Sequence, residues 1–176
     1  MNQKFNFTKL DERTRSLIVE EISMAQGSGE LYFSARFTPI GQQTWPTWLL
    51  TAAKEHDEHW LEYQLEAPGA MKHLETRAKP KGGYTLAHVP DTAAETLADG
   101  QFNRFYIAAI CRRAIEDGKT SVRVYRAKER GEPRPVSVAL EGSTKDAATL
   151  LREVRSKGLS LKCDLLKPME QPMRRF

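Results

Sequence analysis

The amino-acid sequence predicts an α+β fold: a single compact domain in which a central buried helix packs on a small mixed or antiparallel sheet, with extended arms at both ends. Residues 105–111 (FYIAAIC) are apolar on every side of a helix, which is typical of a helix covered by other elements. Residues 121–127 (SVRVYRA) follow closely and alternate as a strand does. A chain of 176 residues can bury such a core without a metal or a disulfide.

The N-terminal part predicts an arm, three helices and one strand. Residues 1–9 read as the arm, and Thr8 or Asp11 can cap the helix that follows. LYFSARF alternates aromatic residues with small or polar ones, which favours a strand. Tryptophan and leucine recur at helical spacing in the next two segments. We therefore expect helices at about 10–25, 41–54 and 57–66, and a strand at 31–37.

The middle of the chain is divided by proline and glycine. Residues 67–90 predict a long loop with one strand pair, near 73–77 and 84–88. A short helix capped by Asp91 or Thr92 should end at Ala98, because Gly100 interrupts the pattern. The central helix should then run over about 101–117 and end at Gly118.

The C-terminal part predicts strands on either side of a last helix. A turn-rich loop at 128–135 follows the strand 121–127, and VSVAL reads as another strand. The central helix should pack on a sheet built from segments near 31–37, 121–127 and 136–140. The remaining expectations are a helix at 145–157, a strand at 159–166 and a basic C-terminal arm at 167–176, so that residues 10–166 form the globular domain of a single-domain chain, 1–176.

Charge is unevenly distributed along the chain. The net charge of +4 divides into −4 over residues 1–70, +5 over 71–136 and +3 over 137–176. Such a split is expected of a basic surface for nucleic acid, of head-to-tail contact between copies of one subunit, or of a dipolar protein with neither use. No apolar run is long enough for a membrane span, and the first residues lack a signal-peptide core, so we expect the protein in the cytoplasm.

Two short motifs resemble ligand sites. His56-Asp-Glu-His59 has metal-ligand spacing but no further ligands at a supporting spacing, so solvated polar residues at a helix end are the better interpretation and no metal is expected. Lys79-Pro-Lys-Gly-Gly83 could present N–H groups and two ammonium groups to a phosphate, but it lacks the pattern of a P-loop. A surface hairpin is predicted there, with phosphate or subunit contact as its role.

Basic residues cluster in two other places. A helix-turn-helix with Gly100 at the turn would need apolar residues where Glu95, Asp99 and Gln101 stand, so this motif is disfavoured. Arg112 can instead pair with Glu116 one turn later. The strand 121–127 carries cations beside Tyr125, which suits either single-stranded nucleic acid or a solvated edge strand.

No grouping of residues predicts catalysis. No Ser/His/Asp or Cys/His arrangement and no carboxylate pair stands in a motif. Cys111 lies in the apolar helix and reads as a core residue, and a disulfide with Cys163 is not expected. We therefore expect no enzyme activity, no catalytic or metal-binding residue, no cofactor and no small-molecule substrate.

Several motifs together resemble a group of small bacterial and phage-associated proteins of unknown activity that share an FNRFYI helix. The motifs are LDERTR, KPKGG, VPxTAAETLAxGxFNRFYI, CRRAIEDG, VYRAK and PRPxS, and the similarity extends from about Leu10 to Arg155. The resemblance implies a phage or mobile-element origin. It carries over no catalytic or binding residue.

These observations favour a non-enzymatic assembly protein, in the first place a phage virion component of the head or connector, that contacts copies of itself or other virion proteins. The alternative is a nucleic-acid-binding or defence-related regulator that uses a basic surface within residues 77–134. Either function would use the same candidate residues, with partner protein or phosphate as ligand. These are Lys79, Lys81, Arg104, Arg123, Arg126, Arg174 and Arg175.

Overall fold

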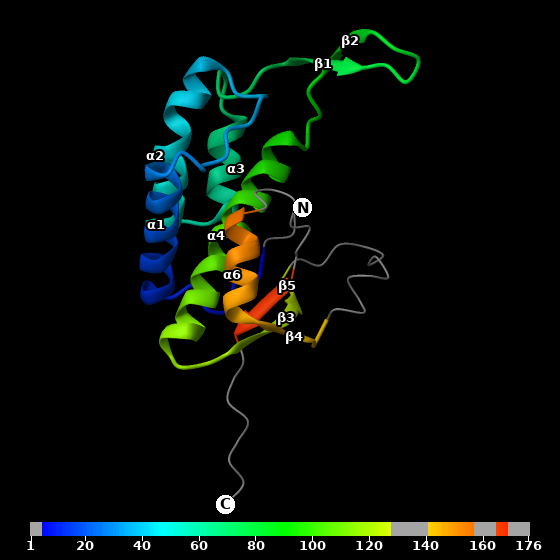
Figure 1. Ribbon diagram of the computed structural model, residues 1–176. Helices are drawn as coiled ribbons and strands as arrows, with labels where there is room; N and C mark the ends of the chain where they lie inside the picture. Colours follow the sequence, from blue (N-terminus) through cyan, green and yellow to red (C-terminus); the bar gives the residue numbers. More distant parts are fainter. Residues whose placement is uncertain (1–4, 128–140, 157–164, 169–176) are drawn as a thin grey trace, which may run out of the picture. The chain divides into compact units, whose positions relative to one another are not determined.

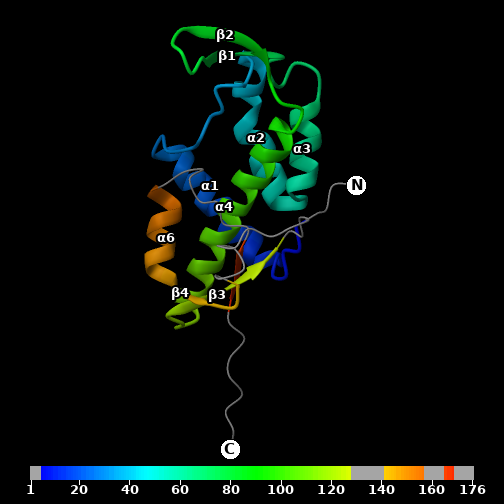
Figure 2. The same ribbon diagram turned by 90° about the vertical axis from the view of Figure 1, so that its right-hand side faces the viewer.

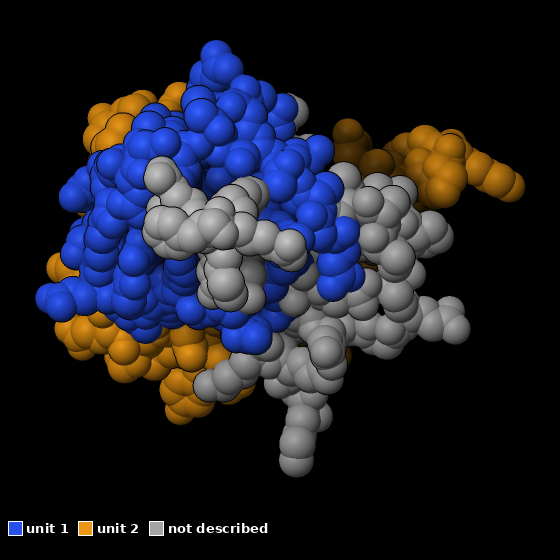
Figure 3. All heavy atoms as spheres, turned by 90° about the horizontal axis from the view of Figure 1, so that it is seen from below, with its two compact units in different colours: residues 1–21, 103–176 blue, residues 22–102 orange. Residues whose placement is uncertain are grey.

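The computed structural model describes residues 5–127, 141–156 and 165–168, with only the backbone given for Arg126 and for residues 165–168 (Figure 1). Helices and small antiparallel sheets confirm the predicted α+β class. The chain divides into two compact units, shown in blue and orange in Figure 3. Unit 1 comprises residues 1–21 and 103–176, and unit 2 comprises residues 22–102.

Unit 1 contains the three-stranded sheet. Its elements are the first part of α1 (Glu12–Gly27), the second part of α4 (Ala93–Glu116), β3 (Ser121–Arg126), β4 (Thr144–Asp146), α6 (Ala147–Ser156) and β5 (Leu165–Pro168). The strand order is β4-β3-β5, and both pairings are antiparallel. In the register, Val122 of β3 lies opposite Lys145 and Pro168. Val122 and Val124 are buried, as expected for the inner face of a sheet.

The composition of this sheet differs from the prediction. Of the three expected segments, 121–127 belongs to it as β3 and 31–37 does not, whereas residues 136–140 lie outside the described part of the chain. β4 was missed because its three residues are all exposed and carry no apolar alternation. β5 overlaps only the end of the strand expected at 159–166, and it includes Lys167 and Pro168, which the prediction had assigned to the C-terminal arm.

The described part of the predicted N-terminal arm packs within unit 1. The Asn6 N–H donates to the Ala127 carbonyl at 2.8 Å, and the Tyr125 hydroxyl donates to the Asn6 carbonyl at 2.7 Å. Phe5 is buried, and the ring of Phe7 lies 4.7 Å from that of Tyr106. The alternation of Phe5 and Phe7 was the signal of this packing, since it places two aromatic side chains on one side of an extended segment.

Helix α4 supplies much of the core. Phe105, Ile107, Ile110 and Cys111 are all buried, which confirms the predicted central helix. The predicted interruption at Gly100 is wrong, because residues 93–116 form one continuous helix. A glycine inside a helix costs about 1 kcal/mol relative to alanine. The fully buried side chains around it offset that cost several times over, since each large apolar side chain contributes about 1.5–3 kcal/mol.

Unit 2 contains α2 (Pro39–Glu55), α3 (Glu58–Glu66) and a separate hairpin of β1 (Leu74–Ala78) and β2 (Tyr84–His88). Thr38 caps α2 by accepting from the Gly41 N–H at 3.1 Å, as cap residues do. Gly41 also allows a close approach of backbones, because a Cβ there would lie 2.0 Å from the Ala70 carbonyl oxygen. The sequence predicted these helices and the hairpin to within three residues at each end.

The strand predicted at 31–37 is wrong. This segment is irregular, and its only ladder contact in the described chain is an isolated bridge between Phe37 and Met71. Its buried aromatic side chain packs instead on α2: the Phe37 ring lies 5.3 Å from that of Trp45. The Trp45 indole N–H donates to the Tyr32 carbonyl at 2.9 Å. Apolar alternation here reflects anchoring of a loop on a helix rather than pairing in a sheet.

We predict that Phe105→Ala lowers the free energy of unfolding by about 3–5 kcal/mol, because it leaves a cavity in the core of unit 1. Phe105 is only 3% exposed. Urea denaturation followed by circular dichroism measures the loss. Ile115→Ala in the same helix is the control, since Ile115 is 43% exposed and should cost far less. Equal losses for the two variants would contradict the burial of this helix face.

Candidate functional site

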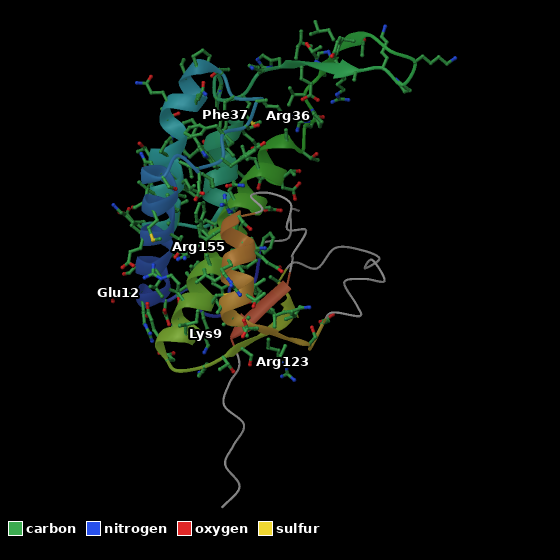
Figure 4. All side chains as sticks on the ribbon, viewed as in Figure 1. Lys9, Glu12, Arg36, Phe37, Arg123 and Arg155 are labelled. Carbon is green, nitrogen blue, oxygen red and sulfur yellow. The ribbon has the colours of Figure 1, made fainter. Side chains whose placement is uncertain are left out.

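Four arginines of unit 1 are engaged by acidic side chains of the same unit, namely Arg13, Arg112, Arg113 and Arg155. Arg112 of α4 donates to Glu20 at 2.7 Å and to Glu21 at 3.3 Å, and it also lies 3.6 Å from Glu116, as predicted. Arg155 of α6, labelled in Figure 4, donates twice to the Glu21 carboxylate, at 2.6 and 3.0 Å. Glu21 is buried, so its carboxylate accepts from two helices in a largely dehydrated setting.

A second set of ion pairs joins the start of α1 to the end of α4. Arg113 donates to both oxygens of Asp11, at 2.7 and 2.6 Å, and to the Thr14 hydroxyl at 2.8 Å. In the opposite sense, Arg13 donates to Glu116 at 3.0 Å and to Asp117 at 2.7 Å. Much of the charge split seen in the sequence is therefore satisfied inside one chain, and it does not by itself call for a second subunit.

Arg104, a predicted binding residue, is part of the core of unit 1. Its side chain is buried, and its Nε and Nη2 donate to the carbonyls of Val154 and Arg155, both at 3.1 Å. These are among the last carbonyls of α6, which have no partner within their own helix. The guanidinium also lies 5.2 Å from the ring centre of Phe105. Arg104 thus caps a helix, and its burial disfavours the predicted role in binding a partner.

The other predicted binding residues of unit 1 do not form a described cluster. Arg123 is exposed on β3, and its Nε lies 3.4 Å from the Gly142 carbonyl (Figure 4). Arg126 pairs through its backbone with β5, but its side chain lies outside the described part of the structure. Arg174 and Arg175 also lie outside the described residues.

Lys79 and Lys81 lie in the exposed turn of the β1–β2 hairpin, which confirms the predicted surface hairpin. The turn uses its own N–H groups: Lys79 donates to the Gly83 carbonyl at 2.9 Å, and Gly82 donates to the Lys79 carbonyl at 3.1 Å. Gly82 and Gly83 have φ of 87° and 80°, which glycine adopts without strain. The turn therefore offers two ammonium groups rather than a ring of N–H donors for a phosphate.

The two faces of this hairpin differ in character. Directly opposite residues of an antiparallel pair share a face. The register pairs Ala78 with Tyr84, Thr76 with Leu86 and Leu74 with His88, and these six residues form what we call the apolar face. Tyr84 is 74% exposed and Leu86 65% exposed. The apolar face consequently meets no other part of the described chain to any large extent.

The opposite face carries a chain of ion pairs. Arg36 donates to Glu75 through Nε at 2.5 Å and Nη2 at 3.1 Å, and Arg77 donates to Glu75 at 2.7 Å. Hydrogen bonds to Arg36, and then to Arg77, hold the pKa of the Glu75 carboxyl below its ordinary value. Arg77 also donates across the hairpin to the His88 carbonyl at 2.9 Å. This face is thus paired, and the apolar face is the one available for contact.

The root of the hairpin is fixed on the segment before α2. Lys72 donates from its N–H to the Arg36 carbonyl at 2.8 Å and from Nζ to the Ala35 carbonyl at 2.7 Å. The bridge between Phe37 and Met71 lies beside these bonds, and Figure 4 labels Arg36 and Phe37 there. Beyond this root the hairpin extends away from α2 and α3 (Figures 1 and 2). It is a projecting element with an anchored base.

Exposed apolar side chains are concentrated in unit 2. Among the large apolar residues exposed in the described chain, only Ile115 belongs to unit 1. The others are Met24, Phe33, Ile40, Tyr63, Leu74, Tyr84 and Leu86. Three of these lie on the hairpin, so the hairpin is the densest part of this apolar surface and the candidate contact site.

The histidine motif forms no metal centre in the described chain. The ring of His56 stacks on Trp60 at 4.6 Å, and His59 Nδ1 lies 3.3 Å from a Glu62 oxygen. No group of three or more histidine, cysteine, aspartate or glutamate residues suited to a metal ion occurs among the described residues. Burial raises the pKa of the Cys111 thiol to about 12, so this cysteine is not a thiolate nucleophile at neutral pH.

The region that resembled a helix-turn-helix contains no turn, because Gly100 lies within continuous α4. Of the three polar residues that disfavoured the motif, Asp99 and Gln101 are buried. Among the described residues, no helix has the length and apolarity needed to cross a bilayer. Comparison of the chain with protein-family models, curated proteins and solved structures finds no match, so the candidate site depends on the geometry alone.

We predict that Glu21→Gln lowers the free energy of unfolding by about 3 kcal/mol, the lower end for a broken buried pair, because Arg112 and Arg155 keep some access to water. The matched control is Glu20→Gln. Glu20 also pairs with Arg112, but its side chain is 56% exposed, so the loss should not exceed about 1 kcal/mol. Urea denaturation compares the two. Equal losses would show that burial of Glu21 does not govern the cluster.

We also predict a stability difference between the wild type and Asp11→Asn that depends on pH. The Arg113 guanidinium, helped by Thr14, lowers the pKa of Asp11 from 3.8 to about 2. A lowered carboxyl pKa stabilises the fold above its unfolded value, and that stabilisation is lost as the pH falls toward the folded value. The wild type should therefore exceed the variant in stability above about pH 4 and lose this advantage toward about pH 2. Thermal melts over this range measure it, and a constant difference would refute the assignment.

Proposed function

We propose that this protein is a non-enzymatic assembly protein that acts through protein–protein contacts made by the β1–β2 hairpin. The observation that carries the proposal is the apolar face of the hairpin, on which Tyr84 and Leu86 are mostly exposed. A two-stranded hairpin is at best marginally stable on its own in water. Here its root is anchored by Arg36 and Lys72, and its apolar face is left for a partner.

The composition of the hairpin suits a protein partner. Tyrosine is enriched at the centres of protein interfaces, where its ring is buried and its hydroxyl keeps a polar contact. Contiguous exposed apolar side chains on a small protein mark interaction sites. The phage virion setting, with contacts to other virion proteins, is part of the same proposal and is tested by whether the protein co-purifies with particles.

The alternative function is nucleic-acid binding, and one observation favours it. Lys79, Pro80 and Lys81 lie at the exposed tip of a two-stranded ribbon, next to the aromatic Tyr84. Ribbons of this kind enter the grooves of DNA, and apolar wedges can part base steps. The arginines weigh against this reading, because Arg104 is buried and Arg112 and Arg113 are engaged by carboxylates.

Light scattering after size exclusion, over a range of protein concentrations, tests the proposal. The wild type should self-associate, and Tyr84→Ser with Leu86→Ser should weaken association without loss of helix, since both side chains are exposed. Ile115→Ser, which removes an exposed apolar side chain from unit 1, is the control and should associate normally.

A binding assay with duplex DNA at several salt concentrations is run beside it. Nucleic-acid binding would appear as an affinity that falls with a logarithmic slope of about 0.9 for each phosphate contact. A wild type that stays monomeric at every concentration and binds DNA in this salt-dependent way would replace the assembly proposal with the alternative.

A further inference from the structure

We infer that the partner of the hairpin is a second copy of this chain, and that the hairpin docks on the α2–α3 surface of that copy. This inference rests on the proposed assembly function and names its contact. It follows from three features of unit 2 alone: the distribution of charge, the exposed face of α3, and the direction in which the hairpin extends.

Unit 2 joins a basic hairpin to an acidic body. Residues 72–83 carry four lysines and arginines and one glutamate. The rest of unit 2, outside residues 72–88, carries two lysines and arginines and nine aspartates and glutamates, of which Glu58, Glu62 and Asp99 are buried. The six acidic residues that are not buried, with the two basic ones, leave a net charge of −4. A hairpin of net charge +3 and a body of opposite sign are complementary. Such charges attract two copies toward each other and orient them as they bind.

The charged groups at both surfaces are available. In the described part of the chain, the side chains of Lys79 and Lys81 are exposed and make no ion pair or hydrogen bond. The same holds for Glu55 at the end of α2 and for Glu66 at the end of α3. These carboxylates are therefore ready to receive the two ammonium groups of the hairpin tip without first breaking an existing pair.

The exposed face of α3 also offers an apolar contact. His59, Tyr63 and Glu66 are exposed at positions i, i+4 and i+7, which lie on one side of a helix. Tyr63 is 68% exposed. An aromatic side chain flanked by His59 and the carboxylate of Glu66 on α3 thus matches aromatic and aliphatic side chains beside lysines on the hairpin. Apolar area gives such a contact its affinity, and the charges give it its register.

The hairpin of one copy does not cover its own α3. Its root is fixed beside residues 35–38, just before α2 begins, and from there β1 and β2 extend away from α2 and α3 (Figures 1 and 2). The two complementary surfaces of one chain therefore stay apart. In a dimer, the hairpin of each copy can dock on the α2–α3 surface of the other, so that the same contact is made twice. This is the self-complementary arrangement of a two-fold dimer.

Charge reversal on each surface tests this contact in the full-length protein. Lys79→Glu with Lys81→Glu reverses the hairpin, and Glu55→Lys with Glu66→Lys reverses the body. Each double variant places like charges together, so each should weaken dimerisation by more than about tenfold. An equimolar mixture of the two variants should restore dimers, because the acidic hairpin of one then meets the basic body of the other. Sedimentation velocity measures both effects.

Glu30→Lys with Asp91→Lys is the matched control, since it makes the same change of charge on exposed residues of unit 2 outside the two surfaces. It should dimerise normally by itself, and in an equimolar mixture it should not draw the hairpin variant into dimers as the body variant does. Circular dichroism verifies that every variant keeps its helix content.

The charge-reversed variants distinguish a wrong contact from a protein that does not assemble. Dimers that persist in both reversed variants would overturn the named contact while leaving assembly intact. Recruitment of the hairpin variant into dimers by the control as fully as by the body variant would also overturn it, because net charge alone would then explain the pairing. A monomeric wild type whose salt-sensitive DNA binding is lost in the hairpin variant and kept in the body variant would overturn both.

Discussion

The buried carboxylate of Glu21 is the interaction on which unit 1 most depends. It accepts from Arg112 of α4 and from Arg155 of α6, and so it joins three helices that are far apart in sequence. A carboxylate removed from water in this way is costly unless cations compensate it, and two cations do so here. Helix α6 is bound a second time, because Arg104 donates to its final carbonyls.

This arrangement changes the meaning of the charge distribution along the chain. In the sequence alone, the acidic N-terminal part and the basic remainder suggest head-to-tail contact between copies of the chain. In the folded chain, three of these acidic residues form ion pairs with three of the arginines inside unit 1. The pairs are Asp11 with Arg113, Glu20 with Arg112, and Glu21 with Arg155. Among the described residues, a contrast without ion pairs lies in unit 2, between the lysines of the hairpin turn and the carboxylates of Glu55 and Glu66.

The sequence predicted the elements better than their partners. Helices with clear periodicity and the glycine-marked hairpin were found, because these signals are local. The strand expected at 31–37 and the break expected at Gly100 failed because tertiary burial decided both: the loop packs on Trp45, and buried neighbours hold the helix through its glycine. For the candidate site, the motif of Lys79 and Lys81 predicted their position on a surface hairpin. The position of Arg104 at the end of α6 could not be predicted, since a cation in the sequence does not show whether it faces water or a helix end. The apolar face of the hairpin was missed because it emerges only from the register of β1 and β2.

The hairpin contributes no buried side chain to the core of unit 2, since every residue of β1 and β2 is exposed or half-buried. Folding of unit 2 therefore depends little on the side chains of the hairpin. Substitutions in 74–88 should cost little stability, whereas the junction of Gly41 with Ala70 tolerates no added side chain. Selection can consequently change the hairpin while the buried scaffold stays constant, and under the proposed self-docking each such change calls for a matching change on the exposed surface of α2 and α3.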